Sequence, residues 1–127
     1  MLTSAGMVQQ DDEETGEAKR AARRLLRLRH ERQRHLHPVD AAGPAWDLML
    51  VLFGLEGGSP GIAVGELSVR ANVPRTTAVR WVRELERHKF VELEQDSSDK
   101  RITRVRLTGT GHSAMTSAFA AADVKVL

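Results

Sequence analysis

The sequence has no cysteine and no tyrosine, and aromatic residues make up only 4% of its 127 positions. The lack of cysteine excludes disulfide bonds, thiol redox sensing and thiolate metal ligands. The longest apolar run, residues 48–53, is far shorter than the ~20 residues of a membrane-spanning helix. The first residues also lack the charged-then-apolar pattern of a secretory signal. We therefore expect a soluble, cytoplasmic protein.

The formal net charge is only +2, although the sequence pI is about 9.5. Much of the acidic charge lies in one block, residues 11–17. If this block belongs to a tail, the folded part is considerably more basic than the total suggests. A basic folded part favours a polyanionic partner. The length allows one domain with tails.

Residues 74–88 have the pattern of an amphipathic helix, with Pro74 suited to its first turn. The expected buried face consists of Ala78, Trp81, Val82 and Leu85. The other faces carry guanidinium, hydroxyl and β-branched groups, which fit guanine edges, phosphates and thymine methyls. These residues are Arg75, Thr76, Val79, Arg80, Arg83 and Arg87. Taken alone, the helix fits a DNA-reading helix and a solvated basic face about equally.

A β-hairpin is expected next, with a first strand beginning at Phe90 and a second ending at Leu107. The polar run of residues 94–100 forms its turn. Its basic residues near the tip or on the return strand are Lys100, Arg101, Arg104 and Arg106. Arginine in such a place can enter a narrow minor groove, and Asp99 is close enough to orient the guanidinium of Arg101.

Three motifs run through this region. A threonine-containing helix that ends in Leu-Glu is present as Thr76, Thr77, Arg80, Leu85 and Glu86. An Asp-x-x-Asp-x-Arg motif is present as Asp96, Asp99 and Arg101, and a Leu-Thr-x-x-Gly motif as Leu107, Thr108 and Gly111. With these motifs, residues 44–119 resemble a winged helix-turn-helix of the multiple-antibiotic-resistance regulator (MarR) type.

The resemblance implies a mainly α fold with a small β-hairpin wing (α+β). It also implies a recognition helix in the major groove and the wing residue Arg101 in the minor groove. The sequence departs from the family at Lys89, where glycine is usual, and at Leu93, where arginine is frequent. The chain also ends soon after the wing, which bears on dimerisation.

The remaining elements complete this fold. Residues 45–55 are apolar on almost every face, which predicts a central helix with Trp46, Met49, Leu50 and Phe53 in the core. Residues 62–63 are expected to add a third strand, and residues 65–71 a helix that lacks an N-cap. Asn72 suits a left-handed turn. Residues 108–122 form a last helix, capped by Thr108 or Thr110, with an inner face of Met115, Ala118, Phe119 and Ala122.

Two segments precede the winged helix of residues 44–108 and its C-terminal helix and tail, residues 109–127. Residues 1–16 are expected to be a disordered acidic tail, either solubilising or a DNA mimic. Residues 17–37 predict a basic helix, whose narrow apolar stripe is Ala18, Ala21, Ala22, Leu25, Leu28 and Leu36. This helix fits dimer packing, which the resemblance favours, or contact with the DNA backbone. A membrane surface is disfavoured because the stripe has no aromatic anchor.

No metal or cofactor is expected. His30, His35 and His37 are close in sequence, but spacings of five and two do not put all three on one helix face. In the family's fold a small-molecule pocket can lie between residues 45–55 and the first helix, and the sequence leaves such an effector unknown.

We expect a non-enzymatic, sequence-specific regulator of transcription that binds double-stranded DNA as a homodimer. Base reading is assigned to Arg75, Thr76, Val79 and Arg80, and phosphate or minor-groove contact to Thr77, Arg83, Lys100, Arg101 and Arg104. The alternative is a winged-helix protein-interaction module with only nonspecific DNA binding, which is weak and sensitive to salt. An enzyme is disfavoured because Asp96 and Asp99 have no histidine or serine partner at a useful spacing.

Overall fold

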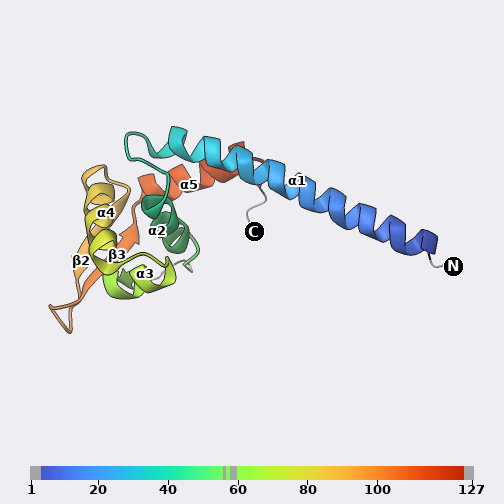
Figure 1. Ribbon diagram of the computed structural model, residues 1–127. Helices are drawn as coiled ribbons and strands as arrows, with labels where there is room; N and C mark the ends of the chain where they lie inside the picture. Colours follow the sequence, from blue (N-terminus) through green and yellow to red (C-terminus); the bar gives the residue numbers. More distant parts are fainter. Residues whose placement is uncertain (1–3, 56, 58–59, 125–127) are drawn as a thin grey trace.

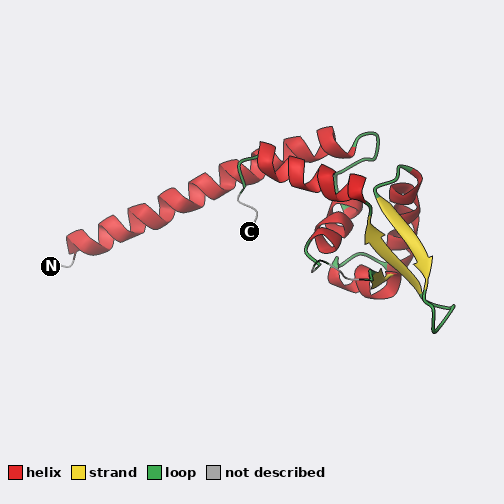
Figure 2. Cartoon of the chain, turned by 180° about the vertical axis from the view of Figure 1, so that it is seen from behind, coloured by secondary structure: helices red, strands yellow, loops and turns green. Residues whose placement is uncertain are grey.

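The computed structural model describes residues 4–55, 57 and 60–124 (Figure 1). Its elements, in chain order, are α1 (Ser4–Leu36), α2 (Pro44–Phe53), β1 (Ile62–Ala63), α3 (Val64–Arg70), α4 (Arg75–Arg87), β2 (Val91–Gln95), β3 (Thr103–Leu107) and α5 (Gly109–Ala121). Helix α5 runs along the C-terminal part of α1, and α3, α4 and the sheet form the other end of the molecule (Figures 1 and 2). The expected fold class, a mainly α winged helix-turn-helix with a small wing, is confirmed.

Helix α2 lies at the centre of the core. Ala45, Leu48 and Met49 are fully buried, and Trp46 and Leu52 are almost so. Helices α3, α4 and α5 and strand β3 all pack against α2. The expectation of a central helix is thus confirmed, but two of its expected core residues, Leu50 and Phe53, are only half-buried. A helix that is apolar on every face has no periodicity to mark its innermost side.

The sheet has the order β1-β3-β2, and both pairings are antiparallel. The hairpin register sets Val91 opposite Leu107 and Gln95 opposite Thr103. The central residue Val105 pairs with Ile62 on one side and Leu93 on the other, and it is fully buried. The short strand expected at residues 62–63 is therefore present, and it fixes the base of the wing to the body.

The first helix differs from its prediction. Residues 4–16 belong to α1 and not to a disordered tail, whereas residues 1–3 lie outside the described part. This stretch contains no proline and is rich in glutamine and glutamate, so extending an existing helix through it costs little. The apolar stripe is buried only at Leu28 and Leu36.

Three helices end in the same way, at a residue with positive φ that is not glycine. These residues are Asn72 (φ 55°) after α3, Lys89 (φ 65°) after α4 and Asp123 (φ 59°) after α5. In each case the following N–H donates to a carbonyl five residues back, as in a Schellman motif. The bonds are Val73 to Ser68 (2.9 Å), Phe90 to Leu85 (3.0 Å) and Val124 to Phe119 (3.0 Å). The left-handed turn expected at Asn72 is confirmed.

The connection from the wing into α5 is closed by Thr108. Its Oγ1 accepts a hydrogen bond from the N–H of Gly111 (2.9 Å) and donates to the carbonyl of Lys89 (2.6 Å). It is therefore both the N-cap of α5, as expected, and a link to the end of α4. Gly111 lies so close to the Phe90 carbonyl oxygen that a Cβ atom would overlap it. This close approach explains the glycine of the Leu-Thr-x-x-Gly motif.

Substituting Gly111 tests this contact. Gly111→Ala should lower the free energy of unfolding by about 1–3 kcal/mol, because a backbone carbonyl cannot move aside as a side chain can. Gly109→Ala is the matched control: a Cβ there meets nothing within 4 Å. Its stability should be equal or higher, since alanine favours helices. Equal urea midpoints for the two variants would contradict the close approach.

Candidate nucleic-acid interface

The turn between α3 and α4 fixes the direction of α4. Asn72 adopts the left-handed conformation, and Val73 is buried behind it. Pro74 is the N-cap of α4, with extended backbone (φ −56°, ψ 143°). Ser68, which is buried, donates from its Oγ to the Gly65 carbonyl (2.7 Å) and so satisfies its hydroxyl inside α3. The expected helix over residues 74–88 is confirmed to within one residue at each end.

One edge of α4 is held in the core. Ala78, Val82 and Leu85 are buried and Trp81 is half-buried, as the spacing predicted. The opposite side is exposed at Arg75, Thr76, Arg80, Arg83 and Arg87. Thr77 and Val79 are half-buried on the two flanks. The helix therefore turns its basic residues to solvent.

The exposed arginines of α4 differ in what holds them. Arg87 donates to Glu84 (2.7 Å) and lowers the pKa of that carboxyl. The guanidinium of Arg80 lies over the Trp81 ring, 5.6 Å from its centroid, which is a cation–π geometry. Within the described part of the chain, Arg75 and Arg83 pair with no carboxylate. They are thus available to an anionic partner.

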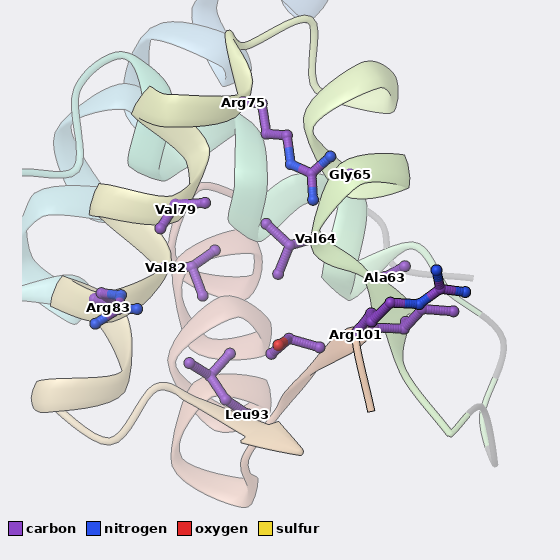
Figure 3. Close-up of a pocket in the computed structure, with 11 residues that line it drawn as sticks. Ala63, Val64, Gly65, Arg75, Val79, Val82, Arg83, Leu93 and Arg101 are labelled. Carbon is purple, nitrogen blue, oxygen red and sulfur yellow. The ribbon is translucent and has the colours of Figure 1, made fainter. Parts of the chain in front are cut away.

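A groove separates α4 from the wing and from α3 (Figure 3). Its volume is about 290 Å³, and its apolar lining includes Val64, Val79, Val82, Leu93 and Ile102. Three guanidinium-bearing residues line it as well: Arg75 and Arg83 from α4 and Arg101 from the wing. The fold thus brings together residues from α4 and the wing that are about 20 positions apart in sequence.

The wing turn is organised by Asp96. Its Oδ2 accepts hydrogen bonds from the N–H groups of Ser98 and Asp99, both at 3.0 Å. Its Oδ1 accepts one from Nε of Arg104 at 2.7 Å. The Arg104 guanidinium, followed by the two backbone donors, lowers the pKa of the Asp96 carboxyl. The turn therefore has an anionic centre with three donors around it.

Asp99 positions the guanidinium of Arg101. Nε and Nη2 of Arg101 donate to the two carboxylate oxygens at 3.0 and 2.9 Å, a bidentate pair. The Arg101 side chain is nevertheless 90% exposed. The pair lowers the pKa of Asp99 and raises that of Arg101. The expected orienting role of Asp99 is confirmed, and it holds the guanidinium in place before any partner arrives.

The predicted DNA-contacting residues fall into four groups. Arg75, Val79, Arg83 and Arg101 line the groove. Thr76 and Lys100 are exposed elsewhere on α4 and at the wing tip, and Arg80 lies with Trp81 in a second hollow beside Pro38 and Asp40.

Arg104 and Thr77 form the last group, and both are half-buried. Arg104 is bound to Asp96, and its Nη1 lies 3.5 Å from the Gly61 carbonyl oxygen. The sequence did not reveal this bracing role, although the strand alternation placed Arg104 on the return strand. Its contact with DNA stays a prediction.

Two other expectations concern sites away from this surface. Among the described residues, no group of three or more histidine or acidic side chains is placed to hold a metal ion. In the same part of the chain, no helix combines the length and the apolar character needed to cross a membrane.

Comparison with known proteins agrees with this geometry. Residues 49–102 match the model of the MarR family. No curated protein matches the chain. Solved structures with the same fold include the MepR–DNA complex of S. aureus, with 15% identity and a TM-score of 0.57 over 94% of this chain and 84% of that one.

Two further structures are similar. The transcriptional regulator MosR of M. tuberculosis in complex with DNA has 20% identity and a TM-score of 0.54, over 94% of this chain and 74% of that one. The PcaV transcriptional regulator of Streptomyces coelicolor, in complex with its natural ligand, has 22% identity and a TM-score of 0.54. That match covers 81% of this chain and 72% of PcaV. At these identities the likeness establishes the winged-helix fold.

The ion pairs of the wing predict how the stability of the wing turn depends on pH. Both carboxyls have a folded-state pKa below the usual value, so the pairs stabilise the wing above the unfolded pKa of about 3.9. This contribution is lost as the pH falls through the lower folded pKa values. Hydrogen exchange at Ser98 and Asp99, corrected for intrinsic rates, should show constant protection from pH 7 to about 5 and a loss below about 4. Protection that declined between pH 7 and 5 would contradict this account.

Proposed function

We propose that this protein, a MarR-type winged helix-turn-helix, is a transcriptional regulator that binds a specific double-stranded DNA sequence as a homodimer. The observation that carries the proposal is the groove between α4 and the wing, with Arg75 and Arg83 on one side and Arg101 on the other. All three are exposed, and none of them is buried against the core. Solved structures of the same fold contain DNA, which supports this use of the surface.

Helix α4 would enter the major groove. Arg75, Thr76, Val79 and Arg80 would read bases, since arginine forms bidentate bonds to guanine and a valine methyl meets the methyl group of thymine. Stacking on Trp81 limits the conformations of Arg80 and so reduces the entropy lost when its guanidinium meets a base edge. Thr77 and Arg83 would bind phosphates and thereby fix the depth and tilt of the helix.

The wing would reach the adjacent minor groove. Lys100 and Arg101 are exposed at its tip, and Asp99 already holds the Arg101 guanidinium in a bidentate pair. A narrow minor groove attracts such a group electrostatically. Arg104 would contribute a phosphate contact in addition to bracing Asp96.

A homodimer would place two α4 helices in successive major grooves, about 34 Å apart along the DNA, and would recognise an inverted repeat. Occupation of a promoter in this way blocks or alters access of the transcription machinery. PcaV was solved with a natural ligand. An effector for the present protein is left open by this proposal.

The function is tested by selecting bound duplexes from a random DNA library at near-physiological salt. The expected result is enrichment of an inverted repeat with half-sites one helical turn apart. A library selected without protein is the control. Binding at low salt with no enriched sequence would overturn the proposal and favour the protein-interaction module.

Two variants distinguish base reading from phosphate contact: Arg80→Ala tests the first and Lys100→Ala the second. Arg80→Ala should relax preference at one position per half-site by about 1–3 kcal/mol. Lys100→Ala should weaken all sequences alike and lower the salt slope of a dimer by about two, because each dimer loses two phosphate contacts. Lys100 is preferred to Arg104 here, since removing Arg104 also removes the Asp96 brace.

Arg34→Ala on α1 is the matched control, because among the described residues this exposed side chain bonds only to Glu31 of its own helix. It should leave both affinity and sequence preference unchanged. Fluorescence anisotropy against the selected site and its single-base variants measures all three effects. Equal, sequence-independent losses for Arg80→Ala and Lys100→Ala would show that the base-reading assignment is wrong.

A further inference from the structure

Helix α3 contains a glycine that its backbone conformation does not require. Gly65 is the second residue of α3 and is half-buried. Among the described glycines, positive φ occurs at Gly43 and Gly61, whereas Gly65 has ordinary helical backbone. Glycine within a helix is less stable than alanine, because the unfolded chain has more freedom to lose. The reason for this glycine should therefore lie in what is next to it.

The space beside Gly65 is occupied by the guanidinium of Arg75 (Figure 3). Nη1 and Cζ of Arg75 lie 3.8 and 3.9 Å from the position that a Cβ atom of residue 65 would take. Outside α3's own backbone and the adjacent residues, no other atom of the described chain lies within 4 Å of that position. Alanine would fit there, whereas a longer side chain would compete with the guanidinium. We call this space the Gly65 notch.

The place of Arg75 on α4 explains why its side chain reaches the notch. Arg75 is the first residue of α4 and directly follows the N-cap, Pro74. The Cα–Cβ bonds of a helix tilt toward its N-terminus, so a side chain at the first position is directed back toward the preceding turn. The left-handed Asn72 and the buried Val73 fix that turn, and α3 and α4 pack together. The fold thus directs Arg75 across α3.

The notch holds the guanidinium by shape and not by charge. Within the described part of the chain, Arg75 pairs with no carboxylate. Glu66, the neighbour of Gly65, accepts a hydrogen bond from Arg70 at 2.7 Å. The donors of Arg75 are therefore available to a base edge or a phosphate, although the direction of the side chain is restricted.

We propose that Gly65 is a positioning residue for Arg75, because the notch sets the direction from which the guanidinium meets DNA. The inference rests on the proposed function, in which Arg75 reads bases, and it adds a residue of α3 to those that determine sequence preference. Bidentate pairing with guanine needs both donors at hydrogen-bond distance and in line. A guanidinium displaced from the notch loses this alignment, although the arginine itself is still present.

A close approach of the DNA backbone to α3 would also favour glycine at this position. The two explanations differ in what they predict. Close approach predicts that every side chain at residue 65, alanine included, weakens binding whether or not Arg75 is present. Positioning predicts that alanine is tolerated, and that the effect of longer side chains depends on Arg75.

The test compares two longer side chains of opposite charge by their effect on sequence preference. Gly65→Glu should capture the guanidinium in an ion pair, and Gly65→Lys should fill the notch and repel it. Both should lower the preference at one position per half-site about tenfold, as expected for the loss of one bidentate contact. Their effects on general affinity should be opposite, because only the carboxylate repels phosphates. Fluorescence anisotropy against the selected site and its single-base variants measures both quantities.

Gly65→Ala is the matched control, since its Cβ fits beside the guanidinium. Its preference should stay within about twofold of the wild type. Each variant is also combined with Arg75→Ala, where Gly65→Glu and Gly65→Lys should change general affinity alone. Circular dichroism should show the wild-type fold throughout, because replacing a helical glycine favours the helix.

The notch is also measured without DNA, by nuclear magnetic resonance of the free protein. Nuclear Overhauser contacts between the Hα protons of Gly65 and the Arg75 side chain are expected in the wild type. Gly65→Glu should shift the Nε–H resonance of Arg75 and slow its exchange with water, whereas Gly65→Ala should leave both almost unchanged. A wild-type chain without these contacts would overturn the inference.

The outcomes separate this inference from the proposed function. A selected repeat whose base preference is unchanged by Gly65→Glu and Gly65→Lys, or equally reduced by Gly65→Ala, would overturn the positioning role and leave the function intact. A wild type that selects no sequence would overturn the function. In that case, a loss of nonspecific affinity in Gly65→Glu that is about tenfold smaller with Arg75→Ala would still support the notch. A loss of equal size in both backgrounds would overturn it.

Discussion

The burial of one edge of α4 against α2 sets the direction of every group on its outer face. Helices α2 and α4 pack together, and Ala78 of α4 is fully buried. Val82 and Leu85 are buried on the same edge of α4. Rotating α4 would expose this edge and bury guanidinium groups, which is unfavourable on both counts. The orientation of Arg75, Arg80 and Arg83 thus follows from hydrophobic packing.

The wing depends on a different kind of interaction. Its strands are fixed by pairing with β1 and by the buried Val105, whereas its turn is fixed by the Asp96 carboxylate. The turn has little apolar surface to bury, so polar bonds must define it. Such bonds are local and exchange with water. The base of the wing is therefore fixed by packing, and its turn is fixed by hydrogen bonds and ion pairs.

Most of the fold could be predicted because its signals are local. The spacing of Ala78, Val82 and Leu85 predicted the buried side of α4, and Asn72 predicted the turn before it. Three things could not be read in this way. The innermost side of α2 has no periodic marker. Residues 4–16 are helical because the helix that follows them in the chain extends through them, and local sequence does not show this. The bond between Arg104 and Asp96 joins residues eight positions apart across a hairpin whose register is set by packing.

The sequence predicted which residues form the candidate surface, but it did not predict how α4 and the wing are placed relative to each other. The sequence gives the residue types on α4 and in the wing, and the pairing of Asp99 with Arg101 follows from their separation of two. The groove that unites Arg75 and Arg83 with Arg101 exists only because β3 passes beside α2 and α3. That relation between distant segments has no signature in the sequence.

At the three left-handed helix ends, a substitution could raise the free energy of unfolding. Asn72, Lys89 and Asp123 adopt a backbone conformation that costs residues other than glycine about 1 kcal/mol each. The apolar residue after each one, Val73, Phe90 or Val124, packs against the core, which keeps the turn in place without glycine. Glycine at Lys89 or Asp123 would relieve the strain without removing any side chain from the groove. These positions thus offer a route to a more heat-resistant protein whose candidate surface is unaltered.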